Sequence, residues 1–534
     1  MLYSKSSLQS GISDPAAPLQ IEELLRAQAY PHPVNGLALR ETHISWVILT
    51  GPVAYKVKKP VHFAFIDATT LARRHHYCSE ELRLNRRLAP ELYEQVVAIT
   101  RTDGQASIGG TGPVVEYAVR MKQFSEAAEL PSLLARHDVS PGEFVALGEL
   151  LARFHQSAAV AAWAGKHDKT EQMYEAVLGN LGQLVASVAE PALTPTLNRL
   201  VDWSLDQARA LEPLFQQREQ SGFIREGHGD LHCANIVRSR GRLTPFDCIE
   251  FDPRLRWIDV INDIAFLVMD LVSHDRTDLA FAMLSRYLET TGDYESIRLL
   301  PFYAVYRALV RAKVDVLTAQ QVLARAGEFR LRLHERIRAA VHWTEHRQPA
   351  LVLMHGLSGS GKSWLSEQMV SAVPAIRLRS DIERKRLAGL EATTRTAAQL
   401  RQGLYSPELS HRTYSRLADC AETCLRAGLS VIVDAAFLEA ADRELFTTLA
   451  TRMRVPWLIV SCHADSETLA RRIRERSQHA ADASDADLAI LATQLKSAQP
   501  LSETERAQAV TADTGATNTT AHVAAAVRAS LAET

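Results

Sequence analysis

The stretch LVLMHGLSGSGKS at residues 351–363 has the residue types and the spacing needed to bind phosphate. Glycines after a short apolar run let successive N–H groups turn toward phosphate oxygens, and the next helix adds its positive N-terminal end. In such loops the lysine, here Lys362, reaches the β- and γ-phosphates, and the serine, here Ser363, holds Mg²⁺. The loop consists of Gly356, Leu357, Ser358, Gly359, Ser360, Gly361, Lys362 and Ser363. The sequence therefore predicts a site for a nucleoside triphosphate.

Two acidic residues follow later strand-like runs of the same region. Asp434 ends the run VIVD, where a carboxylate can act on Mg²⁺ through water, and a plain strand-end aspartate is the alternative. Asp381, in RSDIER, is placed to accept the proton of an attacking hydroxyl, and Arg384, three residues on, to hold an acceptor group. A helix N-cap formed by Ser380 or Asp381 is the alternative here.

Arginines crowd the helix predicted after the apolar run 457–462. They are Arg471, Arg472, Arg474 and Arg476. One face of this helix could close over the triphosphate and offset the charge that develops during transfer, and Arg472 and Arg476 are the candidates. A solvated charged face is the alternative.

A second set of residues, GHGDLHCAN at 227–235 followed by Phe246-Asp247, could transfer phosphate without a glycine-rich loop. Asp230 would orient or deprotonate the acceptor hydroxyl, and Asn235 with Asp247 would grip Mg²⁺ on the phosphates. The two histidines, His228 and His232, are expected to brace the loop.

Strand and helix patterns alternate after residue 349, which predicts a mostly parallel sheet with helices on both faces and the nucleotide at the carboxyl ends of the strands. The predicted strands are 351–355, 376–379, 430–434, 457–462 and 509–512. The predicted helices are 362–372, 406–427, 439–452, 465–477, 485–498 and 520–532.

The earlier part of the chain starts with β-type runs at 42–49 and 53–58, joined by Thr50-Gly51-Pro52. A helix (72–88) and a strand (95–100) follow, and the chain is mainly helical from about 141, except at 225–253. A long Arg-rich helical pattern (303–341) ends at HWTEHRQP, residues 342–349. We expect an N-terminal extension (1–35), a first domain (36–345) and a second domain (349–534).

The composition indicates an ordinary globular protein. The 534 residues, 46% hydrophobic and 23% charged, are too many for one core. The net charge of −2 and the pI near 6.8 argue against nucleic-acid and membrane partners. No signal peptide or membrane span is predicted, and six cysteines in this length do not indicate a disulfide framework. Cys420 and Cys424 are expected in the core. The expected location is the cytoplasm.

The motifs GLSGSGKS, RSDIER, VIVDA and RRIRER resemble those of the small P-loop kinases, such as gluconate kinase, the kinase domain of polynucleotide kinase and zeta-toxin-like enzymes. The resemblance spans about 349–534. It implies ATP-dependent phosphorylation of a hydroxyl, with Asp381 as the base and the arginine helix as a lid. The chain has no Asn-Lys-x-Asp motif for reading guanine, which favours ATP over GTP.

The segment 225–265 resembles the aminoglycoside phosphotransferase and choline kinase group, which has a protein-kinase-like fold. This resemblance spans about 36–340. It implies that Asp230 is the catalytic carboxylate, that Asn235 and Asp247 are metal ligands, and that Lys56, in VAYK, binds phosphate. Glu80, or its neighbour Glu81, would pair with Lys56 from the following helix. The phosphate-covering loop would be only 50–52, with a single glycine, which departs from the pattern of the group.

We therefore expect two domains, an α+β protein-kinase-like domain and an α/β P-loop domain. Together they would form an ATP-dependent phosphotransferase with two Mg-ATP sites and a small-molecule hydroxyl acceptor. One alternative is a nucleotide-gated regulator whose first domain is a degenerate kinase fold. A 5′-hydroxyl nucleic-acid kinase is another, although the near-neutral pI argues against it.

Overall fold

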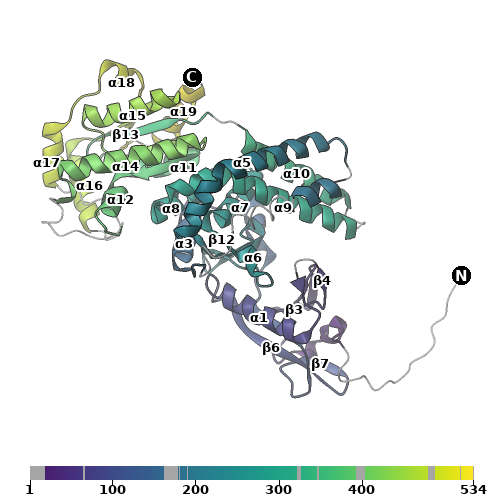
Figure 1. Ribbon diagram of the computed structural model, residues 1–534. Coiled ribbons are helices and arrows are strands. Elements are labelled where there is room, and N and C mark those ends of the chain that lie inside the picture. The colour runs from purple at the N-terminus through teal and green to yellow at the C-terminus, as the bar shows by residue number, and fades with distance from the viewer. Residues whose placement is uncertain are drawn as a thin grey trace. The chain divides into compact units, whose positions relative to one another are not determined.

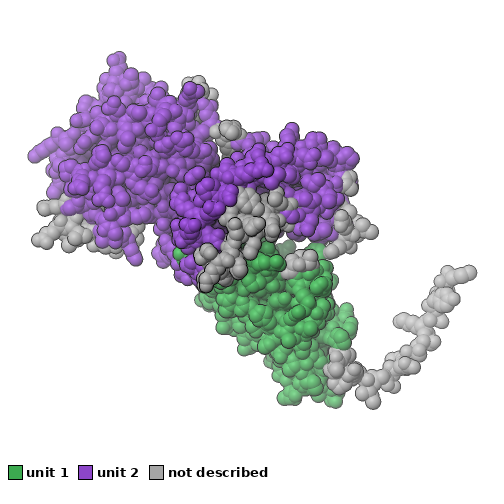
Figure 2. Space-filling view, viewed as in Figure 1, with its two compact units in different colours: residues 1–138, 225–258 green, residues 139–224, 259–534 purple. Residues whose placement is uncertain are grey.

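The chain forms two compact units (Figure 2). Unit 1 comprises Met1–Asp138 with Arg225–Ile258, and unit 2 comprises Val139–Ile224 with Asp259–Thr534. The domain limits 36–345 and 349–534 stay predictions, and much of the expected extension 1–35 lies outside the described residues. The computed structural model describes residues 18–63, 66–161, 179, 181–188, 190–321, 326–345, 348–391, 403–478, 488–516 and 519–532.

Unit 1 is built on an antiparallel sheet with strand order β1-β2-β3-β8-β6-β7. Alternating buried side chains such as Tyr55 and Val57 of β3 form its core. Helix α1 (Leu71–Asn85) contacts β3, β6 and β8, and it begins where the Thr70 hydroxyl accepts from the Arg73 N–H. The strands are β1 (Ala38–Glu41), β2 (Ser45–Leu49), β3 (Val53–Lys58), β6 (Tyr93–Thr102), β7 (Gln105–Ile108) and β8 (Val114–Lys122).

Short elements complete this part of the fold, and they lie within or at the edges of unit 1. They are β4 (His62–Phe63), β5 (Ile66–Asp67), α2 (Leu130–Ala135), β9 (Ile224–Glu226), β10 (Ile236–Ser239), β11 (Arg242–Pro245), α6 (Pro253–Arg256) and β12 (Trp257–Asp259), with the 3₁₀ turns η1 (Ile21–Leu24), η2 (Ala27–Ala29), η3 (Glu126–Ala128) and η4 (Cys233–Asn235). The antiparallel pair β10–β11 returns the chain from Asn235 to Asp247. The predicted interruption at 225–253 is thus confirmed.

Unit 2 begins with a helical part. Its elements are α3 (Pro141–Ser157), α5 (Thr194–Gln220), α7 (Val260–Ser273), α8 (Thr277–Thr291), η5 (Tyr294–Leu299), α9 (Leu300–Gln321) and α10 (Ala326–Thr344). Helix α7 is buried along nearly its whole length, as its apolar sequence requires. The pattern at 303–341 comprises two helices, α9 and α10, which contact each other, and residues 322–325 between them lie outside the described residues.

The remainder of unit 2, from β13 to α19, is called here the P-loop part (Figure 1). Its five strands are all parallel, in the order β14-β15-β13-β16-β17. They are β13 (Leu351–His355), β14 (Ala375–Arg379), β15 (Ser430–Asp434), β16 (Trp457–His463) and β17 (Ala509–Asp513). The helices are α11 (Lys362–Ala372), α12 (Ser380–Leu387), α14 (Pro407–Arg426), α15 (Ala440–Met453), α16 (Ser466–Gln478), α17 (Leu488–Ser497), α18 (Glu503–Ala507) and α19 (Thr519–Ala532). Helices α11, α14 and α19 pack on the sheet.

The fold class expected from the sequence is confirmed. An α+β N-terminal part with a mixed-length antiparallel sheet precedes a parallel α/β P-loop part, and the five predicted strands match the observed ones to within a residue or two. All six cysteines are buried with free thiols, so Cys420 and Cys424 are core residues as expected. Among the helices of the described ranges, none combines the length and the apolar character needed to cross a bilayer.

Candidate active sites of the two units

The glycines of the P-loop are required by close backbone approaches. Gly356 has a φ of +137°, and a Cβ there would lie 2.5 Å from the carbonyl oxygen of Cys462. Gly361 has a φ of +84°, and a Cβ there would lie 2.9 Å from the side chain of Thr514. Neither conformation suits a residue with a side chain. The loop therefore wraps tightly against β16 and the end of β17, as a phosphate cradle must.

Lys362 and Ser363 open helix α11 directly after this loop. The Lys362 ammonium donates to the carbonyl oxygens of Gly356 and Leu357, both at 2.8 Å, so it folds back across the loop. The Ser360 hydroxyl oxygen is buried, with no hydrogen-bond partner among the described residues. An unsatisfied buried hydroxyl in this loop fits a ligand that brings its own polar atoms.

Sheet register places Asp434 beside the loop. Met354 of β13 pairs with Asp434, so both strands end at the same edge of the sheet. The Asp434 carboxylate is buried, and the Ser366 hydroxyl of α11 lies 3.1 Å from its Oδ2. Arg379 Nε lies 3.7 Å from the same oxygen. Asp434 therefore lies next to the P-loop and its role toward Mg²⁺ stays a prediction, whereas nothing in the sequence indicated the contacts of Ser366 and Arg379.

Asp381 and Arg384 lie on the first turns of α12. Arg384 Nη1 donates to Asp381 Oδ1 at 3.0 Å, and the guanidinium lies over the ring of Tyr405, 4.7 Å from its centre. The Asp381 carboxylate is partly exposed, whereas Arg384 is buried. Asp381 accepts no cap hydrogen bond at the start of α12, so the helix-cap alternative has no support. Its role as a base stays a prediction.

Arg472 of helix α16 contacts the P-loop. Arg472 donates to the hydroxyl of Thr514 at 2.8 Å and to the carbonyl oxygens of Thr514 and Gly359 at 3.0 and 3.3 Å. Its guanidinium therefore fastens the loop to the end of β17. The side chain of Arg476 lies outside the described residues, and the lid role of this helix stays a prediction.

A second polar contact to the loop comes from α17. The Ser358 N–H donates to the side-chain oxygen of Gln494 at 2.8 Å. Leu491 of the same helix packs with Leu469, Ile473 and Leu357. The Gln494 side chain therefore occupies one N–H group of the P-loop. No motif in the sequence indicated this contact.

The donor set of the P-loop fits a magnesium-bound nucleotide. Ser363 offers a hydroxyl and Asp434 a carboxylate, which are the hard oxygen ligands that Mg²⁺ prefers. A Cβ at Gly356 or Gly359 would collide with a backbone oxygen, so only glycines allow the tight loop that can surround a phosphate.

In unit 1, the loop at 227–235 brings Asp230 and Asn235 together. The Asn235 amide donates to Asp230 Oδ2 at 3.0 Å and to the Asp230 carbonyl oxygen at 2.9 Å. His228 Nε2 lies 3.0 Å from the Phe246 carbonyl oxygen, and the Asp230 N–H lies 3.3 Å from His228 Nδ1. These contacts are those of a loop brace, as expected for this histidine. His232 likewise accepts from the Ala234 N–H.

The loop is closely fitted to its surroundings. Gly229 has a φ of +86°, and a Cβ there would lie 2.8 Å from the Leu255 carbonyl oxygen. Just after α1, Arg87 donates to the carbonyl oxygens of Glu226 and Gly227 at 2.7 and 3.0 Å. The turn that follows α1 is therefore hydrogen-bonded to the start of this loop.

Lys56 lies in a cluster of buried charges formed by β3, α1 and the chain after β11. Its ammonium pairs with Glu81 Oε1 at 2.8 Å and with Asp247. Lys58, on the same face of β3, pairs with Glu81 and Glu250. Burial alone would raise the pKa of Glu81, but the two lysines lower it to about 2. Burial raises the pKa of Glu250, although Lys58 opposes this.

The choice of Glu80 as the partner of Lys56 is wrong, and its neighbour Glu81 takes that place. Glu80 instead pairs with Arg83 and Arg256, at 2.8 and 3.2 Å. The buried face of α1 includes Cys78, Glu81 and Asn85, which are one helical turn apart. Glu80 is rotated off this face, so it cannot reach β3.

The hairpin between β2 and β3 does not present its N–H groups to a ligand. Those of Thr50 and Gly51 donate to the side-chain oxygen of Gln123 at 3.0 and 2.9 Å, and Pro52 has none. Gly51 has a φ of +100°, with Asn35 packed against it. A phosphate-covering loop needs such N–H groups, so the departure noted in the sequence has a structural counterpart.

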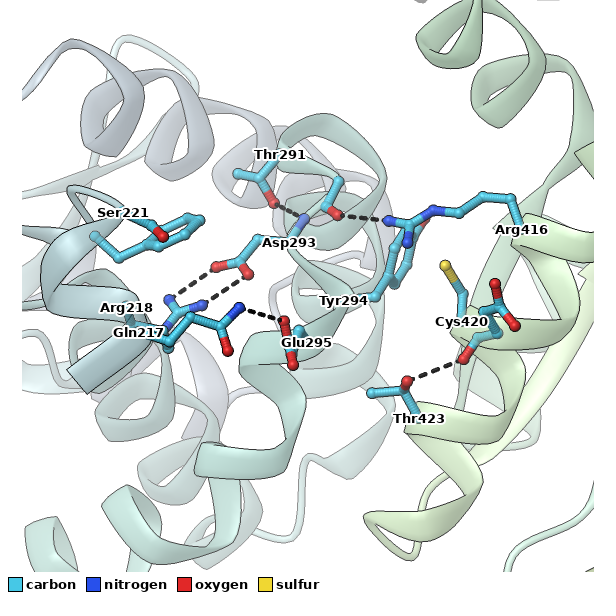
Figure 3. Close-up of a pocket in the computed structure, with 13 residues that line it drawn as sticks. Gln217, Arg218, Ser221, Thr291, Asp293, Tyr294, Glu295, Arg416, Cys420 and Thr423 are labelled. Carbon is cyan, nitrogen blue, oxygen red and sulfur yellow. Dashed lines mark hydrogen bonds and ion pairs between the residues drawn. The ribbon is translucent and has the colours of Figure 1, made fainter. Parts of the chain in front are cut away.

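Unit 2 also contains a cavity of about 440 Å³ that none of the predicted site residues lines (Figure 3). In this view Asp293 pairs with Arg218, at 2.8 and 2.9 Å, on one wall. On the other wall Arg416 of α14 reaches toward the Gly292 carbonyl oxygen at 3.5 Å. The cavity thus lies between the helical part and the P-loop part.

Comparison with known proteins agrees with the P-loop reading. A family model described as an AAA domain, AAA_33, matches residues 351–501. The uncharacterized protein Rv2004c of Mycobacterium tuberculosis (strain ATCC 25618 / H37Rv) is 31% identical over 459 residues, which cover 85% of this chain and 89% of that protein.

Two solved structures match parts of the chain. A putative kinase from Chloroflexus aurantiacus is 22% identical, and the match covers 35% of this chain and 100% of that one with a TM-score of 0.29. A choline/ethanolamine kinase family protein from Mesorhizobium loti is 13% identical, and the match covers 59% and 90% with a TM-score of 0.37. At these values neither structure assigns an activity. The identity over most of both sequences does show the family: the chain belongs to that of the mycobacterial protein Rv2004c, and its C-terminal part matches the AAA domain.

Proposed function

We propose that the chain is an ATP-dependent phosphotransferase whose P-loop holds the phosphate donor. The observation that carries the proposal is the grouping of Lys362, Ser363 and Asp434 at one edge of a parallel sheet. They surround a loop whose glycines could not be replaced by residues with a side chain. This is the arrangement that phosphoryl transfer needs, because the chemistry depends on positioning and on charge stabilisation. The match to an AAA domain supports the same site.

Within this site each residue has a definite task. The loop N–H groups and Lys362 hold the β- and γ-phosphates, and Ser363 with Asp434 would hold Mg²⁺, which when bound offsets the charge on the phosphate oxygens. Asp381 takes the proton of the acceptor hydroxyl, and the oxygen of that hydroxyl bonds to the γ-phosphorus. The bond between the γ-phosphorus and the oxygen that bridges it to the β-phosphate breaks, and ADP leaves. Arg384 donates to Asp381 at 3.0 Å and so fixes the orientation of that carboxylate. The acceptor is a small molecule with a hydroxyl group.

The kinase-like half could provide a second transfer site through Asp230, Asn235 and Asp247. Against this, Gln123 already occupies the N–H groups of the short hairpin loop, and Lys56 pairs with two carboxylates. These observations favour the alternative that this half binds or senses a ligand without transferring phosphate.

Incubation of the full chain with ATP and a library of hydroxyl-bearing metabolites tests the proposal. Asp381→Asn should slow phosphate transfer by roughly 10²–10⁴-fold, the usual contribution of a general base. Asp206→Asn, at an exposed position of α5, is the matched control and should leave the rate unchanged. Transfer at the wild-type rate by the Asp381→Asn variant would refute the assignment of the base.

The same assay decides between the two readings of the kinase-like half. If Asp230→Asn abolishes transfer to one acceptor while Asp381→Asn spares it, this half is a second enzyme. If no acceptor depends on Asp230, the half is a sensor. Turnover of ATP that never requires an acceptor would contradict the phosphotransferase itself.

A further inference from the structure

An arginine is buried at the centre of an edge strand of the P-loop sheet. Arg377 of β14 is 3% exposed, and its partner, Glu289, is 1% exposed and belongs to α8 of the helical part. Arg377 Nε lies 2.6 Å from Glu289 Oε1, and Nη2 lies 3.2 Å from Oε2. Such a two-point pair fixes the guanidinium in orientation as well as in position. Glu289 of helix α8 therefore fixes the position of the Arg377 guanidinium.

The same helix also satisfies the edge of the sheet. Among the strands that the structure describes, β14 pairs only with β15, so its outer N–H groups need other acceptors. The Arg377 N–H donates to the hydroxyl of Ser285, one turn before Glu289 on α8, at 2.9 Å. Arg386 of α12 adds a bond to the Glu289 carbonyl oxygen at 2.6 Å. The P-loop part thus contacts α8 both through an ion pair and through hydrogen bonds that involve backbone groups.

Both members of the pair are ionised. Burial alone would raise the pKa of Glu289, but Arg377, Arg379 and Arg286 lower it below its ordinary value. Burial likewise opposes the charge on Arg377, but Glu289 first and Asp434 after it raise the pKa of Arg377. Glu289 of α8 is therefore the chief counter-charge of Arg377, and Asp434 at the end of β15 adds a weaker one.

The other end of the guanidinium contacts the P-loop itself. Arg377 Nη1 lies 3.2 Å from the Ser363 carbonyl oxygen and 3.4 Å from the Ser366 hydroxyl. That hydroxyl lies 3.1 Å from both the Ser363 carbonyl oxygen and Asp434 Oδ2, and it can donate to only one of them at a time. Because Arg377 donates to both the carbonyl and the hydroxyl, it leaves the hydroxyl proton for Asp434.

We propose that Glu289 is a positioning residue of the P-loop site, which acts through Arg377 to set the geometry of Ser363 and Asp434. The inference rests on the function proposed above and extends it, because a residue of the helical part then completes the metal-binding end of the nucleotide site. Without Glu289, Arg377 is no longer held against the Ser363 carbonyl oxygen and the Ser366 hydroxyl, so the Ser366 proton is no longer kept for Asp434, the carboxylate that Mg²⁺ needs. Loss of Glu289 should therefore weaken the gain in ATP affinity that Mg²⁺ provides.

The test compares ATP binding by the full chain with and without Mg²⁺, measured by calorimetry. Glu289→Gln, which keeps the size of the side chain, should reduce the Mg²⁺-dependent gain in affinity by about tenfold, or 1.4 kcal/mol, and should change binding in EDTA far less. The control is Glu367→Gln on α11, where a half-exposed carboxylate pairs with Arg286 at 3.4 Å. This variant removes the same charge close to the P-loop and should bind within about twofold of the wild type.

Glu289→Gln leaves a buried arginine unpaired, so a second variant keeps the test decisive if that protein does not fold. Glu289→Met with Arg377→Met replaces the pair by apolar side chains of similar size, an exchange that proteins often tolerate. It should fold, as shown by circular dichroism, and still lack most of the Mg²⁺-dependent gain. A folded variant of either kind that keeps the wild-type gain overturns the inference. Failure of the wild-type chain to bind ATP at all would instead refute the proposed function.

Discussion

Replacing Lys58 by methionine removes the positive charge that lies between two buried carboxylates. The Lys58 side chain is fully buried and pairs with Glu81 and Glu250, whose side chains are 0% and 4% exposed. Breaking a buried pair by removing one partner costs about 3–5 kcal/mol, because the remaining charge has no compensation. The protein can limit this cost by protonating one carboxyl group. With an ordinary pKa of about 4.3, that step costs about 3.7 kcal/mol at pH 7 and about 1 kcal/mol at pH 5.

We therefore expect Lys58→Met to destabilise unit 1 by about 3–4 kcal/mol at pH 7 and by only about 1 kcal/mol at pH 5. The sign follows from linkage, since the variant's folded state binds a proton that the unfolded chain has already released at these pH values. Hydrogen exchange of the peptide 45–58, followed by mass spectrometry in increasing urea, reports the stability of this unit. We assign the expected destabilisation to the burial of the ion pairs, and not to the loss of a lysine as such.

The neighbouring residue provides the control for this experiment. Lys59 pairs with Glu41, whose side chain is 63% exposed, and a pair of this kind contributes about 0–1 kcal/mol. Lys59→Met should therefore be nearly neutral at both pH values. The reasoning is refuted if Lys58→Met costs no more than Lys59→Met, or if its cost is the same at pH 5 as at pH 7.

Three further predictions concern the P-loop part. Gly356→Ala should abolish ATP binding, since the new Cβ would lie 2.5 Å from a backbone oxygen. The control is Gly428→Ala, where the φ is +76° and nothing lies close to the new Cβ; it should lower the free energy of unfolding by only about 1–2 kcal/mol and leave ATP binding intact. Asp442→Asn should stabilise the chain by about 1 kcal/mol above pH 6 and not below pH 4, because burial and Glu439 raise the pKa of this partly exposed carboxyl to about 6; an unchanged melting temperature at pH 7.5 would contradict this. Gln494→Ala should tighten ATP binding by roughly 2–10-fold by freeing a loop N–H, and weaker binding in calorimetry would show that the glutamine assists the nucleotide instead.

The sheet of the P-loop part and the position of its loop could be predicted from the sequence, for a physical reason. In a parallel α/β sheet each strand is a short apolar run that ends in the site, so local patterns locate both the element and its functional end. Asp434 follows from this rule, because the last residue of a buried strand must lie at the edge where the P-loop begins. The three loop glycines with positive φ follow in the same way from their motif.

The charged partners of the buried residues could not be predicted in this way. Glu289 and Arg377 are 88 positions apart, and Lys58 and Glu250 are 192 apart, so no local pattern links them. One signal was nevertheless present. Glu81 shares the helical phase of the buried residue Cys78, whereas Glu80 does not, and that phase distinguishes the buried glutamate from its neighbour.

The central claim is that the P-loop of this chain binds magnesium-bound ATP. Isothermal titration calorimetry of the full chain with Mg-ATP, repeated with Lys362→Ala, tests it most directly. The account predicts saturable binding by the wild type and the loss of the P-loop site in the variant, with any second site in the kinase-like half left unchanged. Equal heats and equal stoichiometry for the two proteins would contradict it.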